Sequence, residues 1–328
     1  MRARRGFALL AAMWLVVAIA AVALQFSLDA RERRLLGINA AERGQGRAAA
    51  MGALNATQAA LDAALRQGPG SGNNRSAALR GSDPWLDVDS LFSGTILIDS
   101  IPVDVQARDL GTQLNINNMT EGQLRAFLSF GLKDFSASDH LSQAILDWRD
   151  ADSIPRANGA ERDTYIKDDR LALPTNQPFR EVSDLLNVEG FTPEIYGHLA
   201  QYLTTRGSGI ININSADTVV LRALPGMTDR VLIQILALRS RGRRITSLAQ
   251  VMSSGSTTVT VAVRGGASTV TGNTQTAQQR QLAATTTVNV PEVQLTLTAR
   301  VGPQQLPVRL NAIVTRTGVT SRISWKQW

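Results

Sequence analysis

The 328-residue chain contains no cysteine and only two histidines. Without cysteine it forms neither disulfides nor thiolate zinc sites, so packing or hard metal ions must stabilise it outside the cytoplasm. His140 and His198 are far apart in sequence, and no paired-histidine metal motif, nucleophile elbow or phosphate-binding loop is present. The sequence therefore predicts a protein that is not an enzyme.

The charge balance does not require a nucleic-acid partner. The formal net charge is +7, and removal of Arg2, Arg4 and Arg5 with a leader would leave 7 − 3 = +4. A hydrophobic content of 44% is enough for at least one substantial core. These values indicate a folded protein without a pronounced basic surface.

An apolar run follows the basic leader 1–6 and covers residues 7–28. As a helix it would be about 33 Å long, enough to cross a hydrocarbon core of about 30 Å. The leader arginines place the amino terminus in the cytoplasm and residues 29–328 outside it. We expect a single-pass protein of the bacterial inner membrane with periplasmic domains.

Three interpretations of this start compete: a cleaved signal peptide, a permanent anchor and a pilin-type leader. Small residues such as Ala21 and Ala23 could form a signal-peptidase site, but the apolar run continues into a helix-favouring segment without a break. The Gly6-Phe7 junction instead resembles a prepilin peptidase site, with Phe7 as the first mature residue. We favour the pilin-type leader.

The remaining pattern predicts an α+β fold. One long helix is expected over residues 7–67, with 7–28 in the membrane and 29–67 in the periplasm, because the segment is rich in Ala and Leu. Alternating apolar residues predict strands near 94–107, separated at Ile101-Pro102, and again after 256. We therefore expect 68–111 and 253–328 to form a small antiparallel α/β domain, with an all-α domain inserted at 112–252.

The predicted helical domain contains an internal repeat. Leu114-Asn115-Ile116-Asn117 and Ile211-Asn212-Ile213-Asn214 share one pattern, and a helix start is expected after each, at Thr120 and Ser215. Two further turns, 188–192 and 224–228, match each other and predict helix-hairpin-helix-like units. Such hairpins often contact the DNA backbone, and four arginines follow the second turn: Arg239, Arg241, Arg243 and Arg244. We favour a structural use and keep a membrane-anchored DNA-binding protein of an uptake machine as the alternative.

An acidic segment follows the second predicted helix of this domain. Hard carboxylate oxygens are the ligands that calcium prefers, at about six to eight per ion. The spacing is not that of an EF-hand, because Ile154 stands where the third ligand would be. An exposed loop balanced by neighbouring arginines and lysines is the alternative. The acidic residues are Asp147, Asp150, Asp152, Glu161, Asp163, Asp168 and Asp169.

Taken together, these features resemble the K-type minor pseudopilin of type II secretion systems. The resemblance spans most of the chain and is weakest at 253–291. It rests on the Gly6-Phe7 junction, the long first helix, the paired asparagine motifs, Asp147-Trp148-Arg149-Asp150-Ala151-Asp152 with Gly159-Ala160-Glu161 and Tyr165, and the terminal Trp325-Lys326.

One departure from ordinary pilins fits the K family. The fifth mature residue is Ala11, where most pilin-like subunits carry a glutamate that neutralises a neighbour's amino group in the apolar filament core. Without that carboxylate, the resemblance implies a subunit at the pseudopilus tip.

The resemblance also implies partners, processing and a metal. Prepilin peptidase would cut between Gly6 and Phe7, and Phe7 would be N-methylated. The I-type and J-type minor pseudopilins, the major pseudopilin and the inner-membrane secretion platform would be partners in protein export, and no nucleic acid would bind. Calcium would be held in the helical domain, with Asp150, Asp152 and Glu161 as the expected ligands and Asp147 as a further candidate.

Overall fold

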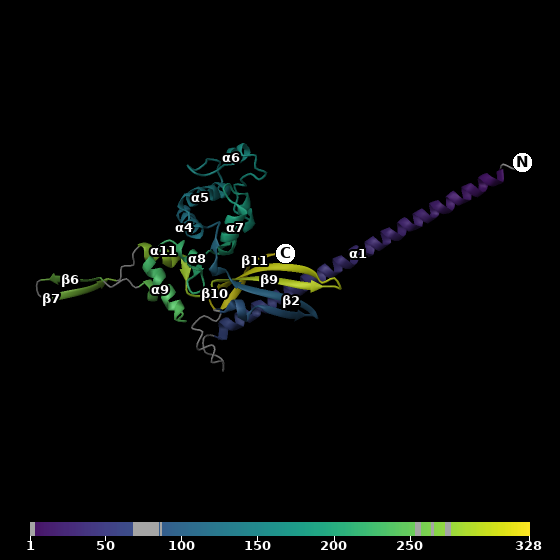
Figure 1. Ribbon diagram of the computed structural model, residues 1–328. Helices are drawn as coiled ribbons and strands as arrows, with labels where there is room; N and C mark the ends of the chain where they lie inside the picture. The colour runs from purple at the N-terminus through teal and green to yellow at the C-terminus, as the bar shows by residue number, and fades with distance from the viewer. Residues whose placement is uncertain (1–3, 68–84, 86, 253–256, 264–265, 273–276) are drawn as a thin grey trace.

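The computed structural model describes residues 4–67, 85, 87–252, 257–263, 266–272 and 277–328. Helix α1 (Arg4–Gln67) is one uninterrupted helix of 64 residues, as predicted, and the Gly6-Phe7 junction lies in its first turns. Its amino-terminal half extends away from the rest of the molecule (Figure 1). By length and composition alone, α1 is the one helix among the described residues that could cross a membrane.

A five-stranded antiparallel sheet packs on the second half of α1, and its strand order is β1-β2-β9-β10-β11. The strands are β1 (Gly94–Ile98), β2 (Ile101–Asp109), β9 (Glu292–Val301), β10 (Leu306–Thr317) and β11 (Thr320–Gln327). The α+β fold with a long apolar first helix is thus confirmed. The short helix α3 (Val88–Leu91) lies against β2.

The turn between the first two strands lies at Asp99 and Ser100, not at Ile101-Pro102 as expected. Both turn residues have positive φ, 46° and 69°, which suits a two-residue antiparallel hairpin. Pro102 stands opposite Leu97 within the strand pair, and the pairing of β2 with β9 begins one residue later. Its missing N–H therefore costs no bond to β9.

The core of this domain lies between α1 and the sheet. Its helix side consists of small and medium side chains, which allows the helix to approach the strands closely. A Cβ added at Gly46 would lie 2.6 Å from a methyl of Val308 and 2.7 Å from one of Val301. Gly46 and Thr57 of α1 are buried, and so are its apolar residues Ala49, Ala50, Ala53, Leu54, Leu61 and Leu65.

The helical insert forms two repeats, as the paired asparagine motifs predicted. The first contains β3 (Leu114–Asn115), α4 (Glu121–Leu132), α5 (Phe135–Arg149), α6 (Arg162–Lys167), η2 (Val182–Asn187), α7 (Pro193–Leu199), η3 (Ala200–Tyr202) and β4 (Leu203–Thr204). The second contains β5 (Ile211–Asn212), α8 (Thr218–Arg222), α9 (Asp229–Ser240), α10 (Ala249–Met252), α11 (Ala277–Thr285) and β8 (Thr286–Thr287). Each repeat is closed by a short parallel pair, β3 with β4 and β5 with β8.

The helix starts agree with the prediction at one position and differ at the other. Thr120 caps α4 and forms a capping box with Gln123. In the second repeat Asp217, rather than Ser215, caps α8. Ser215 instead donates its hydroxyl to the carboxylate of Asp109, so its side chain is committed to the sheet domain.

The insert continues beyond residue 252, where the sequence placed its end. Leu282 of α11 belongs to the hydrophobic core of the insert, and the five-stranded sheet resumes only at Glu292. Within the described residues, β6 (Thr257–Val263) and β7 (Gly266–Gly272) pair with each other and not with that sheet. This hairpin projects from the insert between α10 and α11 (Figure 1).

Candidate functional site

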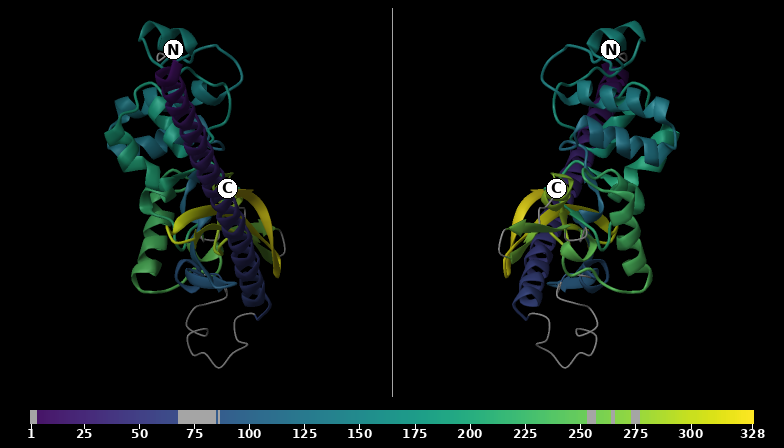
Figure 2. Two further views of the ribbon diagram at one scale, coloured as in Figure 1. Left: turned by 90° about the vertical axis from the view of Figure 1, so that its right-hand side faces the viewer. Right: turned by 90° about the vertical axis from the view of Figure 1, so that its left-hand side faces the viewer.

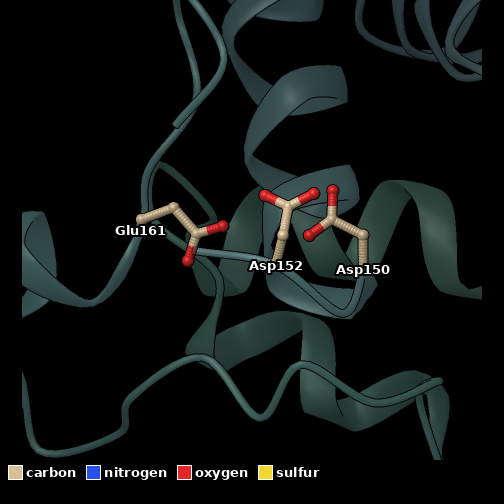
Figure 3. Close-up of side chains that lie close together, drawn as sticks. All are labelled: Asp150, Asp152 and Glu161. Atoms are coloured by element: carbon tan, nitrogen blue, oxygen red, sulfur yellow. The ribbon is translucent and has the colours of Figure 1, made fainter. Parts of the chain in front are cut away.

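Three acidic side chains converge after the end of α5. Asp150 is the C-cap of that helix, Asp152 follows in the loop, and Glu161 occupies the N-cap position of α6. One carboxylate oxygen from each lies within 4.8 Å of the others. Figure 3 shows the carboxylates of these residues facing a common space.

Several oxygens of this cluster are buried without a hydrogen-bond donor. Glu161 is 4% exposed, and neither of its carboxylate oxygens has a partner in the described structure. Oδ1 of Asp150 is likewise buried and unpaired. Burial, followed by the nearby charges of Asp147 and Asp150, raises the pKa of Glu161 to about 6. Buried unpaired carboxylates are costly, so a cation or a proton bound at this cluster would lower its free energy.

Asp147 does not join the cluster, although the sequence named it as a further candidate ligand. It is fully buried and accepts hydrogen bonds from the backbone N–H of Arg156, at 3.1 Å, and from its guanidinium. The same guanidinium contacts Oδ2 of Asp150 at 2.6 Å. Through its bonds to Arg156, Asp147 holds the acidic loop against the end of α5. Arg156 contacts only Oδ2 of Asp150, so Oδ1 has no hydrogen-bond partner.

The acidic loop is tied to the core of the insert at both ends. Trp148 lies between Tyr165 and Phe179, with ring centroids 5.5 and 6.5 Å away. Next to it, the guanidinium of Arg149 donates to the carbonyls of Ile116 and Met119. The geometry of the three carboxylates thus depends on the packing of the first repeat.

The donor set fits a hard cation. Three carboxylates supply oxygen ligands only, which suits calcium or magnesium better than zinc or copper. The positive charge would satisfy the orphaned oxygens of Asp150 and Glu161. Calcium takes about six to eight ligands and tolerates irregular geometry, so carbonyls and water would complete its shell.

The second asparagine of each pair closes its own repeat. Asn117 donates to the carbonyl of Phe179 at 3.0 Å and accepts from the N–H of that residue at 2.8 Å. Asn214 makes the same two bonds with Ile245, each at 2.9 Å. In the first repeat this anchor follows the acidic loop, whereas in the second it follows a short turn after α9.

The turns that suggested DNA binding are used inside the protein. A Cβ at Gly226 would clash with the backbone carbonyl of Gln278, so α11 covers the second turn. Arg239 donates to the carbonyl of Ala216 at 2.6 Å, and Arg244 donates to that of Val288 at 2.9 Å. The second turn and two of the four arginines are therefore engaged within the protein, which disfavours the alternative function, whereas Arg241 and Arg243 are exposed.

Sequence reasoning did not identify the polar contacts between the insert and the sheet. Asp109 ends β2, Glu292 begins β9, and both are buried carboxylates that bind the insert. His140 contacts the Asn158 carbonyl at 2.8 Å and the Glu189 carboxylate. Their partners lie 18 to 103 residues away, so no local pattern marks them.

Comparison with known proteins gives one consistent family. Residues 108–207 match the family model described as type II secretion system (T2SS), protein K. Proteins named type II secretion system protein K from Pectobacterium carotovorum subsp. carotovorum, Klebsiella pneumoniae and Dickeya chrysanthemi are 28%, 32% and 34% identical over 36%, 23% and 22% of this chain. The matches span 40%, 23% and 19% of those relatives' own lengths, less than half of each.

The fold is also similar to a solved structure. One chain of the GspK-GspI-GspJ complex from the enterotoxigenic Escherichia coli type 2 secretion system matches with a TM-score of 0.56 and 16% identity. The match covers 85% of this chain and 95% of that chain. At this identity the match shows the fold, and together with the sequence matches it confirms the resemblance to K-type minor pseudopilins.

Proposed function

We propose that this chain, which resembles protein K of type II secretion systems, is a minor pseudopilin at the tip of a periplasmic pseudopilus. It would initiate pseudopilus assembly with I-type and J-type minor pseudopilins and so support protein export across the outer membrane. The family match at residues 108–207 and the similarity to a chain of a GspK-GspI-GspJ complex support this proposal.

The observation that carries the proposal is the union of a pilin-type helix with a bulky insert. Residues 10–28 of α1 are apolar except Gln25 and Ser27, and all are exposed, as a filament-forming or membrane helix requires. In both views of Figure 2 much of the insert lies to one side of α1, while its uppermost teal part passes across the line of the helix. Subunits of a shaft pack around one another, so a protruding domain fits best at an end. Ala11 in α1 agrees with that position.

Processing and membrane topology follow from the same proposal. Prepilin peptidase would cleave between Gly6 and Phe7 and methylate Phe7, and α1 would anchor the protein in the inner membrane before assembly. The major pseudopilin and the inner-membrane platform would then act on the anchored protein. The globular part of the chain would be periplasmic.

An intact-mass and amino-terminal analysis tests this route. In cells with a type II secretion system, the expected mature protein begins at methylated Phe7, whereas a Gly6→Val variant stays at full length. A wild-type chain that begins at Met1, or one cut after the apolar run, would contradict the proposal. Co-purification of I-type and J-type subunits with the wild type in detergent tests the tip role separately, and its absence would remove that role.

We further propose that Asp150, Asp152 and Glu161 hold a calcium ion. The support is the set of buried, unpaired oxygens on Asp150 and Glu161 described above. An ion there would join α5 to α6 across the acidic loop and thereby stabilise the first repeat. Its role would be structural.

A further inference from the structure

The insert and the sheet domain have separate hydrophobic cores. The core of the insert and the core between α1 and the sheet share no residue. The chain passes between them twice, after β2 and before β9. Domains without a large apolar interface move relative to each other by default, so something else must fix their orientation.

Three residues of the sheet contact one segment of the insert, residues 205–215. This segment, called the linker below, comprises the connection between the two repeats and the first residues of the second repeat, β5 included. The three sheet residues are Asp109 at the end of β2, Glu292 at the start of β9 and Trp325 in β11. These positions are far apart in sequence but adjacent at one end of the sheet.

Glu292 binds the linker most directly. Its Oε2 accepts from the backbone N–H of Ser208 at 2.7 Å and from the hydroxyl at 3.1 Å, while Oε1 accepts from Thr315 at 3.1 Å. Gly207, the preceding residue, has φ +83°. A Cβ there would lie 2.6 Å from Oε2 of Glu292 and would clash with Leu110. A Cβ at this position would therefore have to displace the Leu110 side chain or the carboxylate itself.

Asp109 binds the other end of the linker. Its Oδ2 accepts from the amide of Asn212 at 2.8 Å and from the hydroxyl of Ser215 at 2.6 Å. Its Oδ1 accepts from the N–H of Gly111 at 2.8 Å, so both oxygens are satisfied although the residue is buried. Hydrogen bonds to a buried carboxylate are among the strong ones, and removing one partner is costly.

Two further contacts hold the linker between these carboxylates. The guanidinium of Arg206 lies 4.8 Å from the ring centroid of Trp325. From the insert side, Asn115 donates to the carbonyl of Gly207 at 2.8 Å. The linker is therefore clamped by the sheet and by the first repeat together.

We propose that the 205–215 linker is a latch that fixes the orientation of the helical insert on the sheet. The carboxylates of Glu292 and Asp109 hold it by hydrogen bonds, and the absence of a side chain at Gly207 allows it to approach Glu292. With the latch released, the insert would turn on the two chain crossings while each core stayed folded. The latch thus sets which faces of the insert accompany α1 when the protein meets a partner.

Two glycines of the linker provide a matched test. Gly207 and Gly209 have similar positive φ, +83° and +77°, so alanine strains the backbone comparably at both. At Gly209, however, the nearest atoms to an added Cβ are 3.5 Å away, an ordinary contact. Gly207→Ala therefore opens the latch and Gly209→Ala serves as the control.

Double electron–electron resonance on the full chain in detergent reads the orientation. Because the chain has no cysteine, spin labels can be placed at Leu97→Cys in β1 and Ile233→Cys in α9, which are 70% and 64% exposed. The wild-type background and Gly209→Ala should each give one narrow distance distribution. Gly207→Ala should lose it and give a broad or shifted one, with unchanged helical circular dichroism.

A second variant keeps the test decisive if Gly207→Ala does not fold. Glu292→Leu keeps a side chain of similar size but removes the oxygens that accept from the N–H and hydroxyl of Ser208, and it should broaden the same distribution. A narrow, unshifted distribution in a folded Gly207→Ala, or in Glu292→Leu when Gly207→Ala is unfolded, would overturn the latch.

Discussion

Asn212 donates its side-chain amide to Oδ2 of Asp109 at 2.8 Å across 103 positions of sequence. The corresponding residue of the first repeat, Asn115, instead donates to Gly207. Both asparagines also accept from the N–H two residues later, Asn115 at 3.0 Å and Asn212 at 3.1 Å. The repeats thus share an internal turn, while their side-chain amides donate to different partners, Asp109 of the sheet in one case and Gly207 in the other.

Glu161→Gln should lower the melting temperature in calcium but not in chelator. In chelator the variant removes a buried, unpaired carboxylate from the neighbourhood of Asp147 and Asp150, so its melting temperature should rise or stay unchanged. In calcium it loses a ligand. Calcium at about 100 times its dissociation constant stabilises a folded protein by about 2.7 kcal/mol, and most of this should be lost.

Thermal unfolding in detergent, in calcium and in chelator, measures both effects. Asp163→Asn is the matched control, because Asp163 lies in the same segment but is exposed. It should behave alike in both conditions. Equal shifts of Glu161→Gln in calcium and in chelator would rule out a metal at this cluster.

The two closing asparagines should differ in their effect on calcium. Asn117→Ala releases Phe179, which ends the acidic loop and stacks on Trp148, so calcium affinity should fall about tenfold or more, a typical loss for a supporting contact. Asn214→Ala breaks the equivalent bonds to Ile245, far from the loop, and should leave affinity unchanged. Calorimetric calcium titration distinguishes them, and an equal loss in both variants would contradict the coupling.

Alanine at two glycines of α1 should have opposite effects on stability. Glycine within a helix costs about 0.5–1 kcal/mol relative to alanine. Gly44 has no atom within 4 Å of an added Cβ, so Gly44→Ala should stabilise by about that amount. Gly46→Ala meets Val308 and Val301 and should lower the melting temperature instead. A gain in both variants would mean that α1 does not press on the sheet there.

The latch should also show in the pH dependence of stability. Burial raises the pKa of Asp109 above the usual 3.8, against the opposing effect of its donors. The folded state therefore binds this proton more tightly than the unfolded chain. The stabilisation that this bound proton gives the folded state is fully present below the unfolded pKa of 3.8. It is lost as pH rises through the folded pKa of Asp109.

Asp109→Asn lacks this titration. The wild type should therefore be most stable relative to Asp109→Asn at acid pH, and the difference between their melting temperatures should fall as pH rises. In free energy of unfolding, the loss is about 1.4 kcal/mol for each unit by which folding raises the pKa of Asp109. Asp104→Asn provides the opposite slope, because bonds from Thr95 and Arg300 lower the pKa of Asp104. A flat difference for Asp109→Asn would contradict the raised pKa.

The sequence was sufficient wherever the signal is local. Composition predicted α1, and the Leu114 and Ile211 motifs predicted the two repeats. Spacing marked only an acidic segment, and the resemblance to K-type minor pseudopilins singled out Asp150, Asp152 and Glu161, which the structure brings together. Each of these features is determined by neighbours within a short stretch of chain.

The sequence was insufficient wherever a feature depends on contact between two segments that are distant in the chain. Asp147 has the spacing of a ligand, but Arg156 folds back on it. The alternating residues of β6 and β7 resemble those of the sheet, and alternation does not specify which strand a strand will pair with. Asp109, Gly207 and Glu292 carry no local pattern, so the contact between the domains could be found only in three dimensions.

Helix α1 is continuous from Arg4 to Gln67, about 96 Å at about 1.5 Å per residue, and its last turns are buried against the strands. Because the hydrogen-bonded helix is not interrupted, its exposed amino-terminal part and the part packed on the sheet belong to one element. A displacement of the amino-terminal end would therefore be carried along that element to the strands.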